Sequence, residues 1–493
     1  MEISDHDLQS IQEARNLVNE AREAQKVLAT FSQEQIDRIV EAMAKAGFNN
    51  AERLGKMANE ETGFGRAADK TVKNQFGSMS VYESIKDLKT VGVISENSEK
   101  RIVEVGVPMG VIAGLIPSTN PTSTVMFKAQ IAIKAGNAIV FSPHPGAKKS
   151  IIETVRVIRE AAEAAGCPKG AISCIEILSM ESTSELMKRS DLILATGGTA
   201  MVKAAYSSGT PAIGVGPGNG PAFIERSADI KLAVKCILDS KTFDNGTICA
   251  SEQSIVTEDC IKENVVAELI HQGAYFLNKE EKEKVSAVLM RSNGTMNPKI
   301  VGKSASYIGN LAGIQVPEGT RVLVGPETEV GSKFPFSKEK LCTVLAFYVE
   351  KNAEDACEKC IQILNNEGAG HTLVIHSNNE AIIREFALKK PVSRILVNTP
   401  GALGGIGATT NLVPALTLGC GAVGGSSTSD NIGPMNLLNI RRMAYGVREL
   451  EDIKAAAANG QSGSDSDSEV MQAVLARVLE RFGYKQDGLG SVL

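Results

Sequence analysis

The chain lacks the features that mark membrane proteins, secreted proteins and nucleic-acid-binding proteins. It contains no tryptophan, and aromatic residues make up only 4% of its 493 residues. No run of about 18 apolar residues occurs, so the sequence predicts no membrane-spanning helix. The opening stretch MEISDHDLQSIQEAR has neither a basic nor an apolar segment, which argues against a secretion signal. Positive charge is not in excess either, since the formal net charge is −5, and this disfavours a nucleic-acid partner.

Cysteine is present but scattered. The nine cysteines form no dense framework of the kind that secreted disulfide proteins use, so we expect a reducing, cytoplasmic location. Glycine, in contrast, is abundant at 46 residues, and many glycines stand beside short apolar runs. Tight turns between strands and helices need glycine, so this composition is typical of an α/β protein. A chain of this length exceeds one ordinary core and predicts at least two domains.

The order of apolar patterns predicts two sheets. Residues 4–90 show the spacing of amphipathic helices. From Arg101 onward, short apolar runs alternate with helical stretches as far as PAIGVG, which predicts a parallel sheet with helices on both faces. A second alternation runs from Asp229 to about Arg394. The stretch from Asn398 to Pro434 is rich in glycine and threonine and predicts loops.

The C-terminal stretch differs in composition from the rest. Residues 459–468, NGQSGSDSDS, predict a flexible polar linker, and residues 469–493 predict a short amphipathic helix. Two interpretations stay open. The helix packs on its own or a neighbouring subunit, or it is a detachable targeting peptide. The second resembles the encapsulation peptides that carry enzymes into bacterial microcompartments, where shell or cargo proteins would be its partners.

Cys249 is the main candidate for chemistry. A cysteine thiolate is a nucleophile, but a free cysteine has a pKa of about 8.5 and needs local help to ionise. The common role of a cysteine is a small buried thiol. The surrounding segment FDNGTICASEQS separates Cys249 from that role, because it resembles the catalytic-cysteine segment of the aldehyde dehydrogenase superfamily.

The resemblance extends along the chain to about residue 450. It is greatest for the CoA-acylating branch, including the aldehyde dehydrogenase half of bifunctional bacterial aldehyde–alcohol dehydrogenases and the microcompartment-associated acetaldehyde and propionaldehyde enzymes. The segments that carry it follow in the expected order: IPSTNPTST, IVFSPHP, ILATGG, YSSGTPAIGVGPGNGP, KLCTVLA, GAGHT, LTLGCGAVGGSS and NIGP.

The resemblance implies an α/β fold of three parts. Residues 1–228 would form a Rossmann-like cofactor domain with its N-terminal helices, and residues 229–412 an α/β catalytic domain. Residues 413–450 would return to the cofactor domain and contribute a small oligomerisation element. The family also implies a homodimer or homotetramer.

Two residues receive catalytic roles from the resemblance. Cys249 would attack the aldehyde carbonyl and form a thiohemiacetal. Asn120 would donate its side-chain amide, together with the Cys249 backbone N–H, to the oxyanion. Asn120 also precedes Pro121 and a predicted helix, so an N-cap is an alternative interpretation. The sequence suggests no metal site.

A further set of residues would bind a nicotinamide cofactor. For Gly197, Gly198 and Thr199 the alternative is an ordinary turn between a strand and a helix, and for Glu339 it is a charge on the protein surface. Ser142 stands where hydrolytic relatives have a lysine, so NAD is expected but NADP stays open. The residues are Pro117, Ser118, Ser142, His144, Pro145, Gly197, Gly198, Thr199, Gly216 and Glu339.

Val215 points to the fate of the acyl group. Hydrolytic relatives carry a glutamate at the similar position, and it activates water against the acyl-enzyme. An aliphatic side chain cannot accept a proton, so the acyl-enzyme should await a thiol. We therefore expect an NAD-dependent acylating aldehyde dehydrogenase that uses a short aliphatic aldehyde and coenzyme A. A semialdehyde dehydrogenase that does not use CoA and a binding protein without activity are the alternatives, and the role of His371 stays open.

Overall fold

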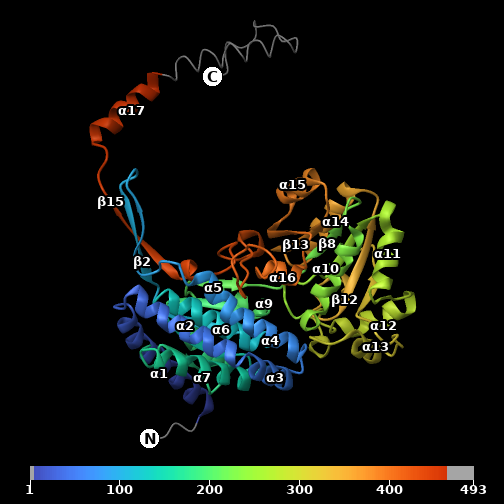
Figure 1. The fold of residues 1–493 in the computed structure, drawn as a ribbon, viewed down its shortest axis with the longest axis horizontal. Helices are drawn as coiled ribbons and strands as arrows, with labels where there is room; N and C mark the ends of the chain where they lie inside the picture. The colour runs from blue at the N-terminus through green and yellow to red at the C-terminus, as the bar shows by residue number, and fades with distance from the viewer. Residues whose placement is uncertain (1–4, 463–493) are drawn as a thin grey trace, which may run out of the picture. The chain divides into compact units, whose positions relative to one another are not determined.

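The computed structural model describes residues 5–462. Residues 5–94 and 106–440 form one compact unit, and residues 95–105 with 441–462 form a second (Figure 1). Both large sheets lie in the first unit. In the described part of the chain, none of the helices is long and apolar enough to cross a membrane.

The chain begins with helices, as predicted. Ser32 and Gln35 form a capping box at the start of α2, and the apolar stripe of that helix is buried against α6 and α7. Asp5 caps α1 by accepting a hydrogen bond from the Leu8 N–H. The elements are α1 (His6–Leu28), α2 (Gln33–Asn49), α3 (Ala51–Thr62), α4 (Ala67–Gln75), a π-helical segment (Phe76–Ser80) and α5 (Val81–Ile85).

A parallel five-stranded sheet in the order β5-β4-β3-β6-β7 follows. Its strands are β3 (Val111–Ile116), β4 (Ala138–Pro143), β5 (Ile172–Cys174), β6 (Leu192–Thr196) and β7 (Ala212–Val215). The connecting helices are α6 (Pro121–Lys134), α7 (Lys148–Ala164), α8 (Met180–Arg189) and α9 (Thr199–Ser207). Almost every strand residue is buried, because helices cover both faces. The prediction of a first parallel sheet is confirmed.

The second parallel sheet has seven strands in the order β10-β11-β12-β9-β8-β13-β14. They are β8 (Pro221–Ile224), β9 (Ser254–Glu258), β10 (Ala274–Phe276), β11 (Val322–Pro326), β12 (Val344–Glu350), β13 (Gly370–His376) and β14 (Val392–Val397). The helices are α10 (Ile230–Thr242), α11 (Lys262–His271), α12 (Lys279–Leu289), α13 (Ala305–Ala312), α14 (Ala353–Asn366), α15 (Glu380–Lys389) and α16 (Gly401–Gly405). Strand β8 pairs with β9 and β13, so the predicted boundary after residue 228 falls beyond the first strand of this sheet.

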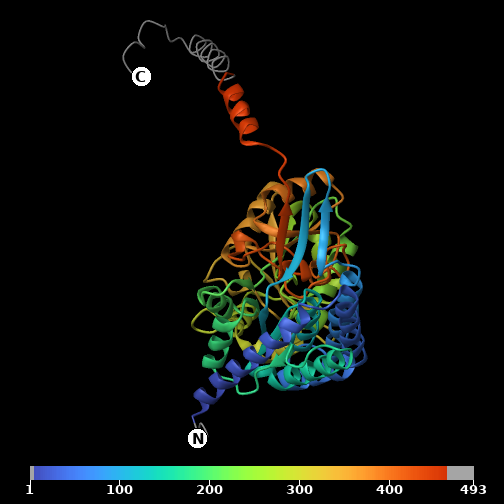
Figure 2. The same ribbon diagram turned by 90° about the vertical axis from the view of Figure 1, so that its left-hand side faces the viewer.

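A three-stranded sheet joins β1 (Gly92–Asn97), β2 (Ile102–Pro108) and β15 (Leu438–Ala444), which lie side by side in Figure 2. Helix α17 (Leu450–Ser462) follows. It includes residues 459–462, where the sequence predicted the start of a linker, so those four residues are helical instead. The remainder of the predicted linker and the predicted helix 469–493 lie outside the described residues.

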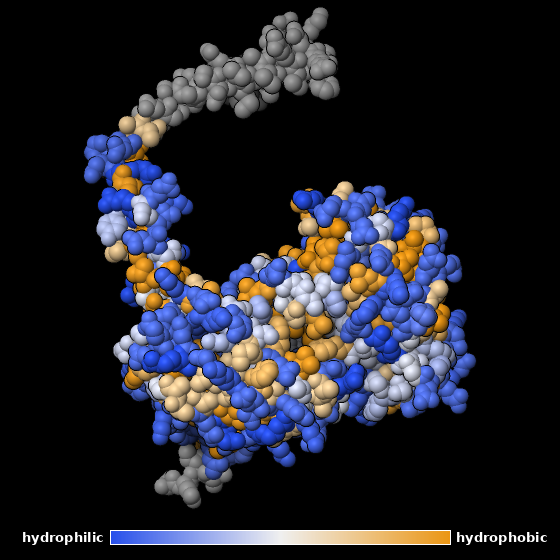
Figure 3. Space-filling view, viewed as in Figure 1, coloured by the Kyte–Doolittle hydropathy of each residue, from blue (hydrophilic) through white to orange (hydrophobic). Residues whose placement is uncertain are grey.

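The segment from β15 to α17 exposes apolar side chains to solvent (Figure 3). Met443, Tyr445, Val447, Leu450 and Ile453 are each about half exposed, with fractions of 49–58%. Exposed apolar residues in series are typical of a surface that another protein surface covers. The segment overlaps the oligomerisation element expected in residues 413–450, and that expectation stays a prediction.

Candidate active site

Most of the predicted cofactor residues meet at one edge of the five-stranded sheet, the edge where the strands end. Pro117 and Ser118 follow β3, and Ser142 to Pro145 close β4 and enter the next turn. Gly197 to Thr199 connect β6 to α9, and Gly216 follows β7. In open parallel sheets, ligands bind at the carboxyl ends of strands near the point where strand order reverses, here between β3 and β6.

This carboxyl edge leaves space at its glycines. A Cβ atom on Gly198 or Gly216 would meet no atom within 4 Å. Gly198 is the N-cap of α9 and supplies no side chain, so the first N–H groups of that helix lack a side-chain cap. At α7, in contrast, the Glu61 carboxylate accepts hydrogen bonds from the Lys149 and Ser150 N–H groups at 2.8 and 2.7 Å. The helix end that suits a pyrophosphate is therefore that of α9.

The residues after β4 divide into buried and exposed groups. Ser142 is buried, and its hydroxyl lies 2.9 Å from the Thr183 hydroxyl. His144 and Pro145 are exposed, and His144 Nδ1 accepts a hydrogen bond from the Gly146 N–H at 3.0 Å. His144 and Pro145 are thus open to a ligand at this edge, whereas the Ser142 hydroxyl is directed toward α8.

The cysteine-bearing segment lies between α10 and β9 and has an unusual backbone. Asp244 and Asn245 adopt left-handed conformations with φ values of 47° and 51°. Such a conformation costs about 1–2 kcal/mol per non-glycine residue, so other contacts must stabilise it. Asp244 accepts a hydrogen bond from the Arg66 N–H at 2.7 Å, and Asn245 donates to the Gly302 carbonyl at 2.9 Å. The segment is consequently fixed from two directions before the chain reaches Cys249.

Cys249 is partly exposed and is packed against Gly218. A Cβ atom on Gly218 would lie only 2.0 Å from the Cys249 carbonyl oxygen, so only glycine fits there. The Gly218 N–H donates to Glu339 Oε1 at 2.9 Å. Glu339 therefore lies at the cysteine and is not the solvated surface charge that the sequence offered as its alternative.

Both acidic groups at this point have raised pKa values. Burial, and then the nearby Glu339, raises the pKa of Cys249 to about 12, although the Arg394 guanidinium opposes the shift. Burial, and then Glu367, raises the pKa of Glu339 to about 8. The Cys249 thiol is thus protonated at neutral pH in this structure, and reaction requires a group that takes its proton.

His371, whose role the sequence left open, lies beside the same glycine. Its ring Cγ is 3.3 Å from the position of a Gly218 Cβ. Nδ1 lies 2.8 Å from the Thr372 hydroxyl, and the buried Nε2 has no hydrogen-bond partner among residues 5–462. Burial, and then the Arg394 guanidinium, lowers the pKa of His371 to about 3, so the imidazole is neutral. A neutral imidazole with one free nitrogen is a proton acceptor or donor in need of a partner.

Asn120 stands at the N-cap position of α6, but its side chain does not cap the helix. Its Nδ2 instead donates to the Thr247 carbonyl at 3.3 Å and to the Thr119 hydroxyl at 3.2 Å. Its Oδ1 accepts a hydrogen bond from Lys73 at 2.5 Å. The side chain is thus directed to the cysteine segment. Asn120 is the N-cap residue of α6 by position, as one interpretation had it, but its amide makes no capping hydrogen bond.

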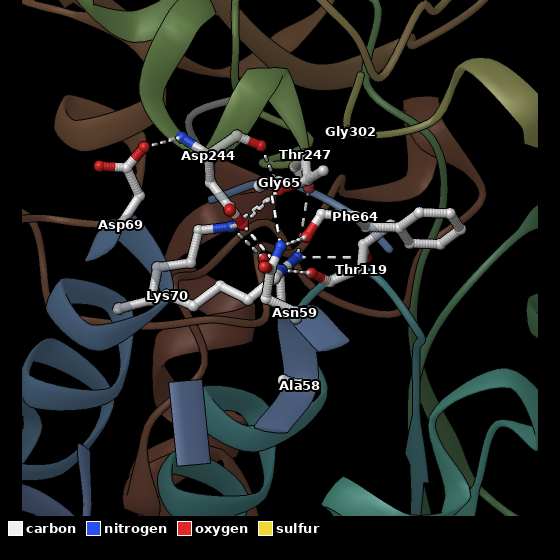
Figure 4. Close-up of polar contacts among 12 residues, drawn as sticks. Ala58, Asn59, Phe64, Gly65, Asp69, Lys70, Thr119, Asp244, Thr247 and Gly302 are labelled. Carbon is white, nitrogen blue, oxygen red and sulfur yellow. Dashed lines mark hydrogen bonds and ion pairs between the residues drawn. The ribbon is translucent and has the colours of Figure 1, made fainter. Parts of the chain in front are cut away.

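Sequence reasoning missed a buried charge cluster beneath this site. Lys70 on α4 bonds Asp244 Oδ2 at 3.0 Å (Figure 4). Lys73 on the same helix bonds that oxygen at 2.5 Å. The Thr247 hydroxyl donates to the same oxygen at 2.7 Å, and the Asp244 N–H donates to Asp69 at 2.9 Å. Two lysines on one helix normally predict a face of that helix that is exposed to solvent. No local signal in the sequence marks these two as buried.

Arg394 holds the glycine-rich segment against the site. Its guanidinium donates to the carbonyls of His371, at 2.9 Å, and Gly419, and to Asn431 Oδ1 at 2.6 Å. Farther along, the Ser426 and Ser427 hydroxyls donate to the β7 carbonyls of Gly214 and Ala212, at 2.8 and 2.9 Å. The segment after residue 413 therefore contacts the first sheet at β7.

Val215, the last residue of β7, is buried with 2% of its surface exposed. Its side chain is aliphatic, so this position offers no carboxylate to activate water.

Comparison with known proteins places the chain in a family. Residues 2–333 match the model of the aldehyde dehydrogenase family. The bifunctional aldehyde-alcohol dehydrogenase AdhE of Escherichia coli is 46% identical over 442 residues, which are 88% of this chain and 50% of that protein. The chain thus spans about half the length of that relative. An acetylating succinate-semialdehyde dehydrogenase of Clostridium kluyveri is 41% identical over 438 residues, which are 89% of this chain and 96% of that protein.

Solved structures agree. A probable aldehyde dehydrogenase from Listeria monocytogenes is 66% identical with a TM-score of 0.90, covering 91% of this chain and 100% of its own. An acetylating aldehyde dehydrogenase from Geobacillus thermoglucosidasius is 56% identical with a TM-score of 0.89, covering 91% and 99%.

More distant structures include a propionaldehyde dehydrogenase from a fucose utilisation bacterial microcompartment of Clostridium phytofermentans, which is 28% identical with a TM-score of 0.80, covering 88% of this chain and 97% of its own. Another is a Rhodopseudomonas palustris propionaldehyde dehydrogenase with bound CoA and an acylated cysteine, 26% identical with a TM-score of 0.79, covering 88% and 97%. The expected α/β fold is confirmed, and the chain belongs to the aldehyde dehydrogenase family.

Proposed function

We propose that this protein is a CoA-acylating aldehyde dehydrogenase that converts an aldehyde, CoA and NAD⁺ into an acyl-CoA, NADH and a proton. The observation that carries the proposal is the hydrogen bond from the Asn120 amide to the Thr247 carbonyl, two residues before Cys249, together with the buried aliphatic Val215 at the position where the resemblance gives hydrolytic relatives a carboxylate. Relatives that are named acetylating or that hold CoA support it. A semialdehyde dehydrogenase that does not use CoA is disfavoured, because the succinate-semialdehyde relative is itself named acetylating.

In the first half of the reaction, the Cys249 thiol releases its proton to solvent, Sγ attacks the aldehyde carbonyl, and a thiohemiacetal oxyanion forms. The developing oxyanion would accept hydrogen bonds from the Cys249 N–H and from Asn120 Nδ2, which would exchange its bond to the Thr119 hydroxyl or the Thr247 carbonyl for one to the oxyanion. One such donor typically contributes about 3 kcal/mol to lowering the barrier. A bound nicotinamide cofactor supplies the hydride acceptor, and a thioester on Cys249 results.

In the second half, the thiol of CoA attacks the thioester on Cys249. The thiol must lose a proton, and the neutral His371 offers a buried nitrogen without a partner next to Gly218. We assign to His371 Nε2 a hydrogen bond to the incoming thiol, whose proton passes on to solvent because His371, with a pKa of about 3, does not retain it. Exchange of one thioester for another is nearly isoenergetic, so the reaction should run in both directions.

The cofactor residues keep the roles that the family resemblance gives them. The open Gly198 and the uncapped start of α9 suit a pyrophosphate at Gly197, Gly198 and Thr199, and Gly216 at the end of β7 leaves room for the cofactor as well. Pro117, Ser118, Ser142, His144 and Pro145 would line the remainder of the same edge. Glu339, which accepts a hydrogen bond from the Gly218 N–H, would also accept a hydrogen bond from a hydroxyl of the nicotinamide ribose. NAD is the proposed cofactor.

The decisive experiment follows NADH after mixing enzyme, NAD⁺ and a panel of short aldehydes, with and without CoA. With CoA we expect continuous turnover and acyl-CoA as product. Without CoA we expect a burst of about one NADH per active site and then a stall, because Val215 cannot activate water. Free carboxylic acid formed at the full rate without CoA would contradict the proposal, and turnover supported by phosphate instead would favour the semialdehyde alternative.

We further propose that the five-stranded sheet carries the cofactor domain and the seven-stranded sheet the catalytic domain. The exposed apolar residues after β15 would then be covered in a homodimer or homotetramer. Light scattering on the purified protein tests this, and replacing Met443 and Val447 by Asp should dissociate the assembly. A monomeric wild-type protein would remove the oligomerisation role.

Residues 469–493 are proposed as an encapsulation peptide that carries the enzyme into a bacterial microcompartment. They lie outside the described residues, so the support is their amphipathic sequence and the microcompartment origin of a structural neighbour. Fused to an unrelated protein, residues 459–493 should carry it into the compartment. Charged replacements of Val474, Leu475, Val478 and Leu479 should prevent the transfer. A truncated enzyme that loses its assembly state without changing location would instead assign the segment to subunit packing.

A further inference from the structure

Lys73 on α4 brings together groups from two other parts of the chain. Its side chain is 2% exposed, and its ammonium donates to Asn120 Oδ1 at 2.5 Å, Asp244 Oδ2 at 2.5 Å and the Thr247 hydroxyl at 2.9 Å. An ammonium has three N–H groups, so these three acceptors satisfy it completely. Asn120 follows β3 of the first sheet, whereas Asp244 and Thr247 precede β9 of the second.

The contact with Lys73 determines which way the Asn120 amide faces. An ammonium only donates hydrogen bonds, so the amide atom beside it must be the oxygen. The Asn120 NH₂ group is then directed away from Lys73, toward the Thr247 carbonyl, two residues before Cys249. A positive charge on the oxygen side also polarises the amide, which strengthens the N–H groups as donors.

Asp244 makes the buried ammonium tolerable. An isolated charge in a protein interior is costly unless it is paired. Burial lowers the pKa of Lys73 to about 8, while Asp244 opposes the shift and Lys70 adds to it. Burial alone would raise the pKa of Asp244, but the Lys73 and Lys70 ammonium groups outweigh burial and hold it below its ordinary value. The pair therefore remains ionised together at neutral pH.

We propose that Lys73 is a positioning residue that assembles the oxyanion-binding site. Its single ammonium fixes the Asn120 amide on one side and the backbone that leads to Cys249 on the other. Lys73 acts through Asn120 and Thr247 and needs no contact with the aldehyde. The inference rests on the proposed roles of Cys249 and Asn120, but it does not depend on CoA.

Lys70 offers a matched control on the same helix. It is also buried, and it bonds the same Asp244 oxygen at 3.0 Å, but its other acceptor is the Thr119 carbonyl at 3.1 Å and not the Asn120 amide. Lys73→Met and Lys70→Met each remove one buried ammonium from Asp244. Only the first removes the contact that orients Asn120.

The test is the rate of the single NADH burst with aldehyde and NAD⁺ in the absence of CoA. We expect Lys73→Met to slow the burst about 100-fold, the effect of losing one oxyanion donor, and Lys70→Met to slow it about threefold or less. Alkylation of Cys249 by iodoacetamide should proceed within about twofold of the wild-type rate in both variants, since the inference concerns the oxyanion and not the thiol. Equal losses in the two variants would overturn the inference.

A double-mutant cycle with Asn120→Ala distinguishes positioning from general support of the fold. If Lys73 acts through Asn120, the Lys73→Met and Asn120→Ala double variant should burst within about twofold of Asn120→Ala alone. If the rate loss of the double variant equals the product of the losses of the two single variants, the two residues act independently and the inference is contradicted. Should Lys73→Met fail to fold, Lys73→Ala with added methylammonium replaces it, and a burst rate that methylammonium does not restore would then count against Lys73. The two proposals fail separately. If the wild-type protein released free acid without CoA, CoA acylation would be refuted. The effect of Lys73 on the first NADH formed would still be measurable, and its role would stand.

Discussion

The two sides of the active site are built in different ways. The carboxyl edge of the five-stranded sheet presents short turns, open glycines and the uncapped start of α9. The cysteine side presents side chains from distant parts of the chain, and the Lys73–Asp244 pair joins residues 171 positions apart. An open backbone edge suits a ligand that brings its own charges, whereas chemistry on a small aldehyde needs fixed groups supplied by the protein. Changes on the cysteine side should therefore lower the rate constant, and changes on the carboxyl edge should weaken cofactor binding.

The largest effect is expected for Cys249→Ala. Loss of the nucleophile should abolish NADH formation, to less than about one part in 10³ of the wild-type rate, because no other group forms the thiohemiacetal. NAD⁺ should still bind, since the carboxyl edge is untouched. Stopped-flow absorbance and calorimetric titration measure the two quantities. Turnover above a trace would remove Cys249 from the mechanism.

Asn120→Ala should rank second. Removal of one oxyanion donor should lower kcat about 100-fold, or about 3 kcal/mol of barrier, with little change in cofactor affinity. Steady-state kinetics with CoA check this. An unchanged kcat with a raised KM for aldehyde would show that Asn120 binds the ground state only.

Two glycines separated by one residue test the difference between the sides directly. Alanine at Gly218 would place a Cβ 2.0 Å from the Cys249 carbonyl oxygen, so kcat should fall at least tenfold by rough estimate and stability by about 1–3 kcal/mol. Alanine at Gly216 would meet no protein atom within 4 Å. Gly216→Ala should therefore keep the stability of the free enzyme and raise the Kd for NAD⁺ a few-fold. Thermal unfolding and cofactor titration separate the two, and equal destabilisation would contradict the assigned packing.

The sequence predicted the structure best where the physical cause is local. The buried strands β3, β6 and β13 appear as continuous apolar runs, because helices cover both faces of their sheets. Strand β1 was missed because nearly all of its residues are exposed, so no buried apolar pattern marks it. Strands β2 and β8 were also missed, although β2 is partly buried and β8 is as short and as buried as the recognised β7. Length and burial therefore do not account for every missed strand.

The same distinction holds for the site. Cys249 and Asn120 were identified because a characteristic segment surrounds each of them. Lys73 and Asp244 were missed, because their contact exists only after α4 packs on the segment before β9. His371 was noticed, but its unpartnered nitrogen depends on the packing around Gly218. Long-range burial of charge leaves no periodicity in a single sequence.

The last expected effect is a pH dependence of stability and concerns Glu339, which belongs to the cysteine side although it was predicted for the cofactor. Burial, and then Glu367, raises its pKa from 4.5 to about 8. Between those values the folded protein holds a proton that the unfolded chain has released, so stability falls as pH rises through this range. Gln does not titrate, so the stability of Glu339→Gln relative to wild type should grow from pH 5.5 to 8.5. Urea unfolding of the cofactor-free protein measures this trend.

Glu153 provides the opposite case as a control. Its hydrogen bond with Arg156 lowers its pKa from 4.5 to about 2, although burial opposes the shift, so the stability that Glu153 contributes is lost only as pH falls below the ordinary value. The difference between Glu153→Gln and wild type should therefore stay constant from pH 5.5 to 8.5. If the difference between Glu339→Gln and wild type also stays constant, Glu339 is already ionised in the free enzyme. It could then accept a hydrogen bond from the ribose hydroxyl without losing a proton when the cofactor binds. If the difference grows with pH, cofactor binding at neutral pH should release a proton from Glu339, which buffers of different ionisation enthalpy detect by calorimetry.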